Sequence, residues 1–157
     1  MGNSAFDSNV QINYRDEPLT ASTNFEIDGT TLMGYTGNDA HVVIPSSVTI
    51  IYHHAFLQCY SLTSVTIPSS VSWIGGEAFG ACENLTSVTF ESPSSLNSIG
   101  EAAFASSGLT NITIPSSVTV IHDYAFNNTK LTNVTLSRGT EVPDSAFPDG
   151  VQINYRD

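Results

Sequence analysis

Histidine and carboxylate side chains are the groups in this sequence that could bind a metal ion or transfer protons. The four histidines are His41, His53, His54 and His122. His53 with a carboxylate such as Glu77 would form a metal site, but we favour the alternative that these are exposed polar side chains on a tolerant surface. No nucleophile, base and orienting acid can be placed together. The sequence also lacks a glycine-rich phosphate loop, HExxH and an EF-hand pattern. We therefore predict no catalytic residue, no metal and no cofactor, and a chain that is not an enzyme.

The two cysteines raise the question of a disulfide. Cys59 and Cys82 each lie three residues after an Ala-Phe pair, and Ser107 and Thr129 occupy the equivalent later places. If these segments stack, neighbouring copies lie about 4.8 Å apart, which a disulfide tolerates. Parallel Cα–Cβ vectors suit its dihedral angle poorly, so we favour buried free thiols over a disulfide. The redox state of the pair stays open.

Hydroxyl and amide side chains alternate with apolar ones in the segments "LTSVTIP", "LTSVTF", "LTNITIP" and "LTNVTLS". Such alternation is typical of a strand with one exposed face. The predicted outward residues, which we take as the candidate ligand-binding positions, are Ser64, Thr66, Ser87, Thr89, Asn111, Thr113, Asn133 and Thr135. Two interpretations remain open: a solubilising face that favours β-structure, or a surface that binds a protein or glycan.

The overall charge narrows the class of partner. Fifteen acidic side chains and four basic ones give a formal net charge of −11. This balance disfavours binding to nucleic acid and to anionic lipid. No apolar run approaches the roughly 18 residues of a membrane span, so we predict no membrane insertion. The start, "MGNSAFDSNV", lacks the basic and apolar regions of a signal peptide.

A repeat organises the sequence that would position these side chains. An Ala-Phe pair recurs at Ala55-Phe56, Ala78-Phe79, Ala103-Phe104, Ala125-Phe126 and Ala146-Phe147, with steps of 23, 25, 22 and 21 residues. A unit this short cannot bury its own apolar face, so stacked copies must share one core, which defines a solenoid.

The repeat also predicts the elements of each coil. Parallel strands are expected to end near Ile44, Ile67, Phe90, Ile114 and Leu136. The predicted inward residues are Leu62, Val65 and Ile67, followed in later units by Leu85, Val88 and Phe90; by Leu109, Ile112 and Ile114; and by Leu131, Val134 and Leu136. A single helical turn is expected around each Ala-Phe pair. Asp28-Gly29 between alternating residues predicts a β-hairpin that covers the first coil.

The unit "LTSVTIPSSVSWIGGEAFGAC" resembles the BspA-like, or Treponema-type, leucine-rich repeat. The resemblance covers about Val42 to Ile153, and the last unit, "SRGTEVPDSAF", departs from it. It implies a mainly β repeat solenoid: a right-handed leucine-rich-repeat coil with parallel strands, short helical turns and an N-terminal β-hairpin cap. It also implies a non-catalytic ligand-binding or adhesion scaffold of an extracellular or cell-surface bacterial protein. A structural spacer in a longer array and an accessory module of a larger enzyme are the alternatives.

The two ends of the chain match each other. Residues 3–16 and 144–157 share ten of fourteen positions at an offset of 141. We predict that residues 1–18 are the tail of a preceding module or a terminal segment, that 19–41 form the hairpin cap and that 42–157 form the solenoid. The matched ends favour a piece of a longer array, and end-to-end self-association through them is the alternative.

Overall fold

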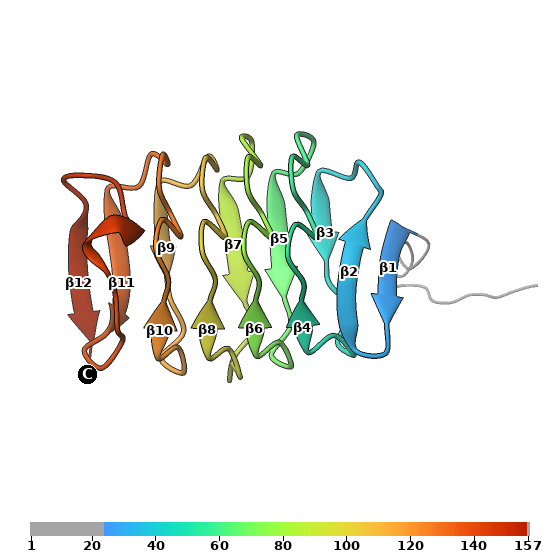
Figure 1. The fold of residues 1–157 in the computed structure, drawn as a ribbon, viewed down its shortest axis with the longest axis horizontal. Helices are drawn as coiled ribbons and strands as arrows, with labels where there is room; N and C mark the ends of the chain where they lie inside the picture. The colour runs from blue at the N-terminus through green and yellow to red at the C-terminus, as the bar shows by residue number, and fades with distance from the viewer. Residues whose placement is uncertain (1–23, 157) are drawn as a thin grey trace, which may run out of the picture.

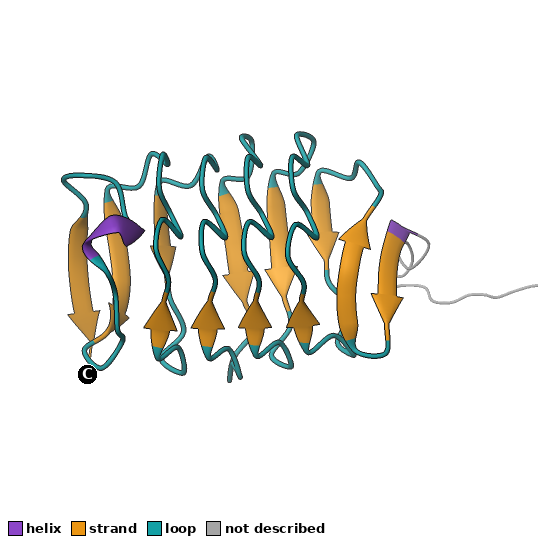
Figure 2. Cartoon of the chain, viewed as in Figure 1, coloured by secondary structure: helices purple, strands orange, loops and turns teal. Residues whose placement is uncertain are grey.

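The computed structural model describes residues 24–156, in which the chain winds into a stack of coils (Figure 1). Most coils have a strand leg, a turn, and a return leg with a shorter strand, and the described residues contain almost no helix (Figure 2). This is the predicted solenoid of parallel strands. The predicted N-terminal tail (1–18) and the N-terminal member of the matched ends (3–16) lie outside the described residues.

The strands form three sheets. On the strand leg lie β3 (His41–Val43), β5 (Ser64–Ile67), β7 (Ser87–Phe90), β9 (Asn111–Thr113), β11 (Asn133–Ser137) and β12 (Gln152–Arg156). On the return leg lie β4 (Ile50–Ile51), β6 (Trp73–Ile74), β8 (Ser98–Ile99) and β10 (Val120–Ile121). A short 3-10 helix, η2 (Asp144–Ala146), stands in the last coil. The return-leg strands join the hairpin in one six-stranded sheet, whereas the strand leg carries two separate three-stranded sheets.

The N-terminal hairpin covers the first coil, as predicted. Strands β1 (Phe25–Asp28) and β2 (Thr31–Tyr35) pair antiparallel around Gly29, whose φ is +63°. Strand β2 then pairs parallel with β4, which aligns Leu32 with Ile51, and both side chains are fully buried. The hairpin therefore continues the solenoid core. The division at residue 41 between cap and solenoid stays a prediction.

A stack of aromatic rings runs through the core. Phe56, Phe79, Phe104 and Phe126 are fully buried, and their successive ring centroids lie 4.8, 5.0 and 5.3 Å apart. The rings are nearly parallel, and Phe147 extends the stack at 5.3 Å. The equivalent residues of successive coils lie one strand spacing apart, so each ring packs on the next. This column confirms that the Ala-Phe pairs form the core.

Tyr35 ends the aromatic stack at the hairpin. Its ring stacks on Phe56 with the centroids 5.1 Å apart, and its hydroxyl donates a hydrogen bond to the Asp39 carboxylate. Burial, aided by this hydrogen bond, raises the pKa of Tyr35 to about 12. Both effects favour the neutral phenol, because the ionised form would lose hydration and face a carboxylate.

This shift predicts a loss of stability in alkali. Below the ordinary tyrosine pKa near 10 the contribution of the neutral Tyr35 is complete, and it is lost as the pH rises toward about 12. The Tyr35→Phe variant has no phenol to ionise. The difference in urea midpoint between wild type and variant should therefore move in favour of the variant above about pH 10. A difference that stays constant with pH would contradict this assignment.

The expected helical turns take the form of consecutive tight turns. In the first full coil, Ala55, Leu57 and Cys59 each donate their N–H to the carbonyl three residues earlier. His54 and Gln58 lie between these bonds in the left-handed region, with φ of 63° and 60°, and donate to carbonyls of the next coil. Later coils repeat the left-handed conformation at Glu77, Ala81, Ala102, Ser106, Tyr124 and Asn128. The left-handed residues stop each turn from continuing into a helix.

The strand leg is interrupted between β7 and β9. At the start of the strands, the Thr86 N–H donates to the Thr63 carbonyl, and the Thr132 N–H donates to the Thr110 carbonyl. Within the described residues the equivalent bond from Thr110 to Thr86 is not formed, and no strand pairing joins β7 to β9. In Figure 1, β7 lies closer to β5 than to β9. The sheet on the return leg passes this point without a break.

The inward residues are buried as predicted, with one local exception. Leu62, Val65 and Ile67 on and before β5 are almost fully buried. Their counterparts in β7, Val88 and Phe90, pack against the core but are only partly buried. The missing pairing beside β7 explains the difference, since no neighbouring strand covers that edge.

Candidate functional site

The predicted outward residues of the strand leg form two columns. Strand β5 aligns with β7 so that Ser64 lies beside Ser87 and Thr66 beside Thr89. Strand β9 aligns with β11 in the same way, and the remaining pairs are Asn111 beside Asn133 and Thr113 beside Thr135. The parallel ladder thus brings together the predicted residues within each half, while the split separates the two halves.

Each column is longer than the sequence suggested. His41 and Val43 of β3 precede Ser64 and Thr66, and the His41 Nδ1 lies 2.7 Å from the Ser64 hydroxyl oxygen. At the other end, Gln152 and Asn154 of β12 follow Asn133 and Thr135. These residues were missed because their segments, "HVV" and "VQINY", lack the "LT" landmark that marks the other strands.

The column residues offer hydrogen-bonding groups with little charge. Five of the eight predicted residues are exposed, and Ser64, Thr66 and Thr135 are half-buried. Val43, which is 66% exposed, adds an apolar contact at one end of the face. In the columns of the described strands no aspartate, glutamate, lysine or arginine occurs. We call this surface the strand face. Its chemistry suits recognition by hydrogen bonds and shape rather than by ion pairs.

A cleft of about 600 Å³ lies where the strand face is split. Residues 86–94 line one side, and residues 111–113 and 115–117 line the other. Val88 and Phe90 contribute apolar surface to it. The Arg156 guanidinium also lines the cleft and donates a hydrogen bond to the Ile114 carbonyl, so its donor groups are partly committed. We refer to this feature as the split cleft.

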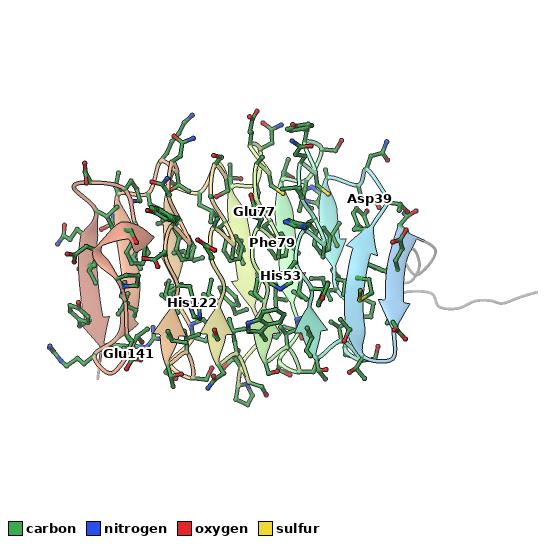
Figure 3. All side chains as sticks on the ribbon, viewed as in Figure 1. Asp39, His53, Glu77, Phe79, His122 and Glu141 are labelled. Atoms are coloured by element: carbon green, nitrogen blue, oxygen red, sulfur yellow. The ribbon has the colours of Figure 1, made fainter. Side chains whose placement is uncertain are left out.

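A second hollow, of about 580 Å³, lies on the return leg. His53, Glu77 and His122 line it, and Figure 3 shows all three on the same side of the molecule. Gly76 and Gly100, which carry no side chains, also line it.

The geometry does not give the His53–Glu77 pair that the less favoured metal site would require. His54, not His53, meets Glu77, with 3.1 Å between Nε2 and Oε1. His53 accepts a hydrogen bond of 2.8 Å from the Gly76 N–H, and its ring meets the edge of Trp73. The tight turn at positive φ explains the exchange, because it turns His54 toward the next coil. Among residues 24–156 no group of three potential metal ligands occurs.

Both cysteines are free thiols in the structure, and they differ in environment. Cys82 is fully buried and donates a hydrogen bond of 3.0 Å to the Phe56 carbonyl, whereas Cys59 is only half-buried. A side-chain interaction between the two thiols lowers the pKa of Cys59. The same interaction, with burial as the second cause, raises the pKa of Cys82. Cys59 is therefore the more reactive thiol of the two.

No helix in the described part of the chain is long and apolar enough to cross a membrane.

Comparison with known proteins places this arrangement among repeat proteins. The profile of the BspA type leucine-rich repeat region matches residues 30–154 with six copies. A search of curated protein sequences found no significant match.

Several solved structures have the same fold. A leucine-rich repeat protein of T. pallidum is 26% identical, with a TM-score of 0.59 over 86% of this chain and 85% of the other. A leucine-rich repeat protein of Bacteroides capillosus is 32% identical, with a TM-score of 0.60 over 72% of this chain and 91% of the other. A leucine-rich cell surface protein of Faecalibacterium prausnitzii is 26% identical, with a TM-score of 0.53 over 88% of this chain and 51% of the other.

Proposed function

Because the chain belongs to the BspA type leucine-rich repeat family, we propose that it is a non-catalytic binding scaffold whose strand face contacts a protein or glycan ligand. The alignment of Ser, Thr and Asn side chains in two columns is the observation that carries this proposal. A repeat solenoid offers such a surface as a rigid array, because each strand is fixed by its neighbours. Little conformational entropy is then lost when a ligand binds.

The proposed setting is the outside of a bacterial cell. The similar protein of F. prausnitzii is described as a cell surface protein, which supports this setting. The high share of Ser, Thr and Asn on the strand face suits contact with hydroxyl-rich or peptide surfaces in water. A net charge of −11 keeps such a chain soluble.

Introducing positive charges on the strand face tests the proposal. The variant with Thr66, Thr89 and Thr113 all changed to lysine should bind an array-identified glycan or extracellular protein about tenfold or more weakly than wild type, because three lysines in a neutral interface lose hydration without gaining partners. Wild-type binding should depend weakly on salt, since the strand face carries little charge. Arrays of glycans and of extracellular proteins, followed by titration of each hit, provide the measurement.

The matched control lies on the return leg. Trp73→Ser removes the large aromatic side chain of the second hollow and should leave the affinity unchanged. If Trp73→Ser abolishes binding and the triple lysine variant binds normally, the functional surface is the return leg. If neither array gives a hit, the chain is better interpreted as a structural spacer than as a binding scaffold. Size-exclusion chromatography of the same samples reports whether the matched ends support self-association.

A further inference from the structure

The split in the strand face leaves two strand edges without partners. Every other pair of neighbouring strand-leg strands is joined by a parallel ladder. At the split, the Thr110 N–H and the Thr86 carbonyl lose the bond that other coils form there. A strand presents its backbone groups at regular spacing along such an edge, and these groups need hydrogen-bond partners.

The unit that contains β7 is irregular in sequence. In the units of β3, β5 and β9 the strand is followed directly by proline, as Ile67 is by Pro68 and Ile114 by Pro115. In the third unit two extra residues, Glu91 and Ser92, stand between Phe90 and the proline. They produce the step of 25 residues between Phe79 and Phe104, the longest in the chain.

The extra length is absorbed on the strand leg alone. After the insertion the coils pair again, because the Asn97 N–H donates to the Ser72 carbonyl and the Gly100 N–H to the Ile74 carbonyl. On the next coil the Thr119 N–H donates to Asn97. The opening is therefore confined to the strand leg, while the return legs of the same coils stay paired.

The split cleft has the size and lining of a binding site. Its volume of about 600 Å³ lies within the range of known ligand sites. Neutral side chains such as Ser87, Thr89 and Asn111 line its rim. The partly buried Val88 and Phe90 add apolar surface, which would be protected from water by an occupant.

We propose that the split cleft binds an extended peptide segment of a partner protein, which hydrogen-bonds to the edges of β7 and β9 and bridges the two halves of the strand face. This mode of recognition adds a strand to an open edge, so that main-chain hydrogen bonds supply the affinity. A glycan fits less well, because its hydroxyls do not repeat at strand spacing and Phe90 is the single aromatic residue among those that line the cleft. The inference rests on the proposed function, since it assigns the strand face its partner.

A random heptapeptide library displayed on phage is the probe for this proposal. The full chain is used as bait, and each enriched peptide is synthesised and titrated by fluorescence polarisation. A second version of the peptide, methylated on alternate backbone nitrogens, should bind about tenfold or more weakly, because it cannot donate to a strand edge. Failure to enrich any peptide, or equal binding of the methylated version, would overturn the proposal.

Deleting Glu91 and Ser92 provides the sharpest variant. The third unit then reads "LTSVTFPSSLNSIG" and has the length of the second, so β7 and β9 should pair and the cleft should close. Peptide affinity should fall about tenfold or more with the loss of both free edges. Equal peptide binding by a folded deletion variant would place the peptide elsewhere and refute the inference.

A pair of tryptophan substitutions covers the case in which the deletion variant does not fold. Ser87→Trp places a large side chain at the exposed rim of the cleft, whereas Ser64→Trp makes the same change in the same column on the fully paired β5. Only Ser87→Trp should weaken peptide binding. The two proposals fail separately: a glycan or protein ligand that is lost in the triple lysine variant but kept in the deletion variant supports the strand face and refutes the peptide cleft.

Discussion

Replacing Phe79 with alanine is expected to lower the free energy of unfolding by about 3–5 kcal/mol, as truncation of a buried phenylalanine does. Phe79 is fully buried and stacks between Phe56, at 4.8 Å with an interplanar angle of 8°, and Phe104, at 5.0 Å and 2°. The change removes two ring contacts and leaves a cavity in the middle of the stack. Neighbouring coils cannot collapse into it without breaking their backbone bonds. Urea unfolding followed by circular dichroism provides the measurement.

Tyr60→Ala is the matched control for this prediction. It also removes one aromatic ring, but Tyr60 is 51% exposed and lies outside the stack. Its loss should change the free energy of unfolding by less than about 0.5 kcal/mol, as is usual at the surface. A Phe79→Ala loss of less than about 1 kcal/mol would show that the aromatic column is not the core of the solenoid.

Gly100→Ala should be the next most damaging change and should lower the free energy of unfolding by about 1–3 kcal/mol. A Cβ atom at this position would lie 2.8 Å from the carbonyl carbon of Gly75 and 2.8 Å from the carbonyl oxygen of Ile74. Both are backbone atoms of the preceding coil, so they cannot turn aside as a flexible side chain would. The two coils would have to separate, and the hydrogen bond from the Gly100 N–H to Ile74 would be stretched.

Gly139→Ala tests whether proximity, rather than the loss of a glycine, is the cause. A Cβ atom at Gly139 would have no neighbour within 4 Å, so this change should have almost no effect on the urea midpoint. Similar effects of the two substitutions would contradict the close approach of the coils at Gly100.

The repeated positions could be predicted from the sequence because one unit constrains the next. Once the Ala-Phe pair and the "LT" landmark set the register, the inward and outward residues follow from strand alternation. Phe79 and Leu62 are accordingly buried, and Thr66 and Thr89 lie side by side on the strand face. Stacking of equivalent residues turns a pattern along the chain into columns in space.

The left-handed turn residues could not be predicted in this way. Ala81 and Ala102 adopt φ of 55° and 54°, although alanine shows no preference for this region. Asn128 also adopts this conformation, and asparagine is one of the few residue types enriched in the left-handed region. The bonds between coils impose the conformation, so it depends on neighbouring units and has no local signal. The pairing of Glu77 with His54 rather than with His53 has the same origin.

The sequence indicated the irregular unit but not the opening of the sheet. The step of 25 residues and the delayed proline at Pro93 mark an irregular unit. They do not reveal whether the extra length forms an outward loop or opens the sheet. In the structure β7 keeps all four residues paired with β5, and β9 pairs with β11, so the sheet is open between β7 and β9.

The continuous sheet on the return leg gives the split a mechanical consequence. Strands β6, β8 and β10 remain paired behind the opening, so this sheet joins the two halves of the molecule. We expect the two halves to tilt relative to each other through small changes of twist between β8 and its neighbours. On the strand leg no ladder crosses the opening, so widening or narrowing the opening breaks no strand pairing. We therefore expect the stack of coils to bend most easily at the split.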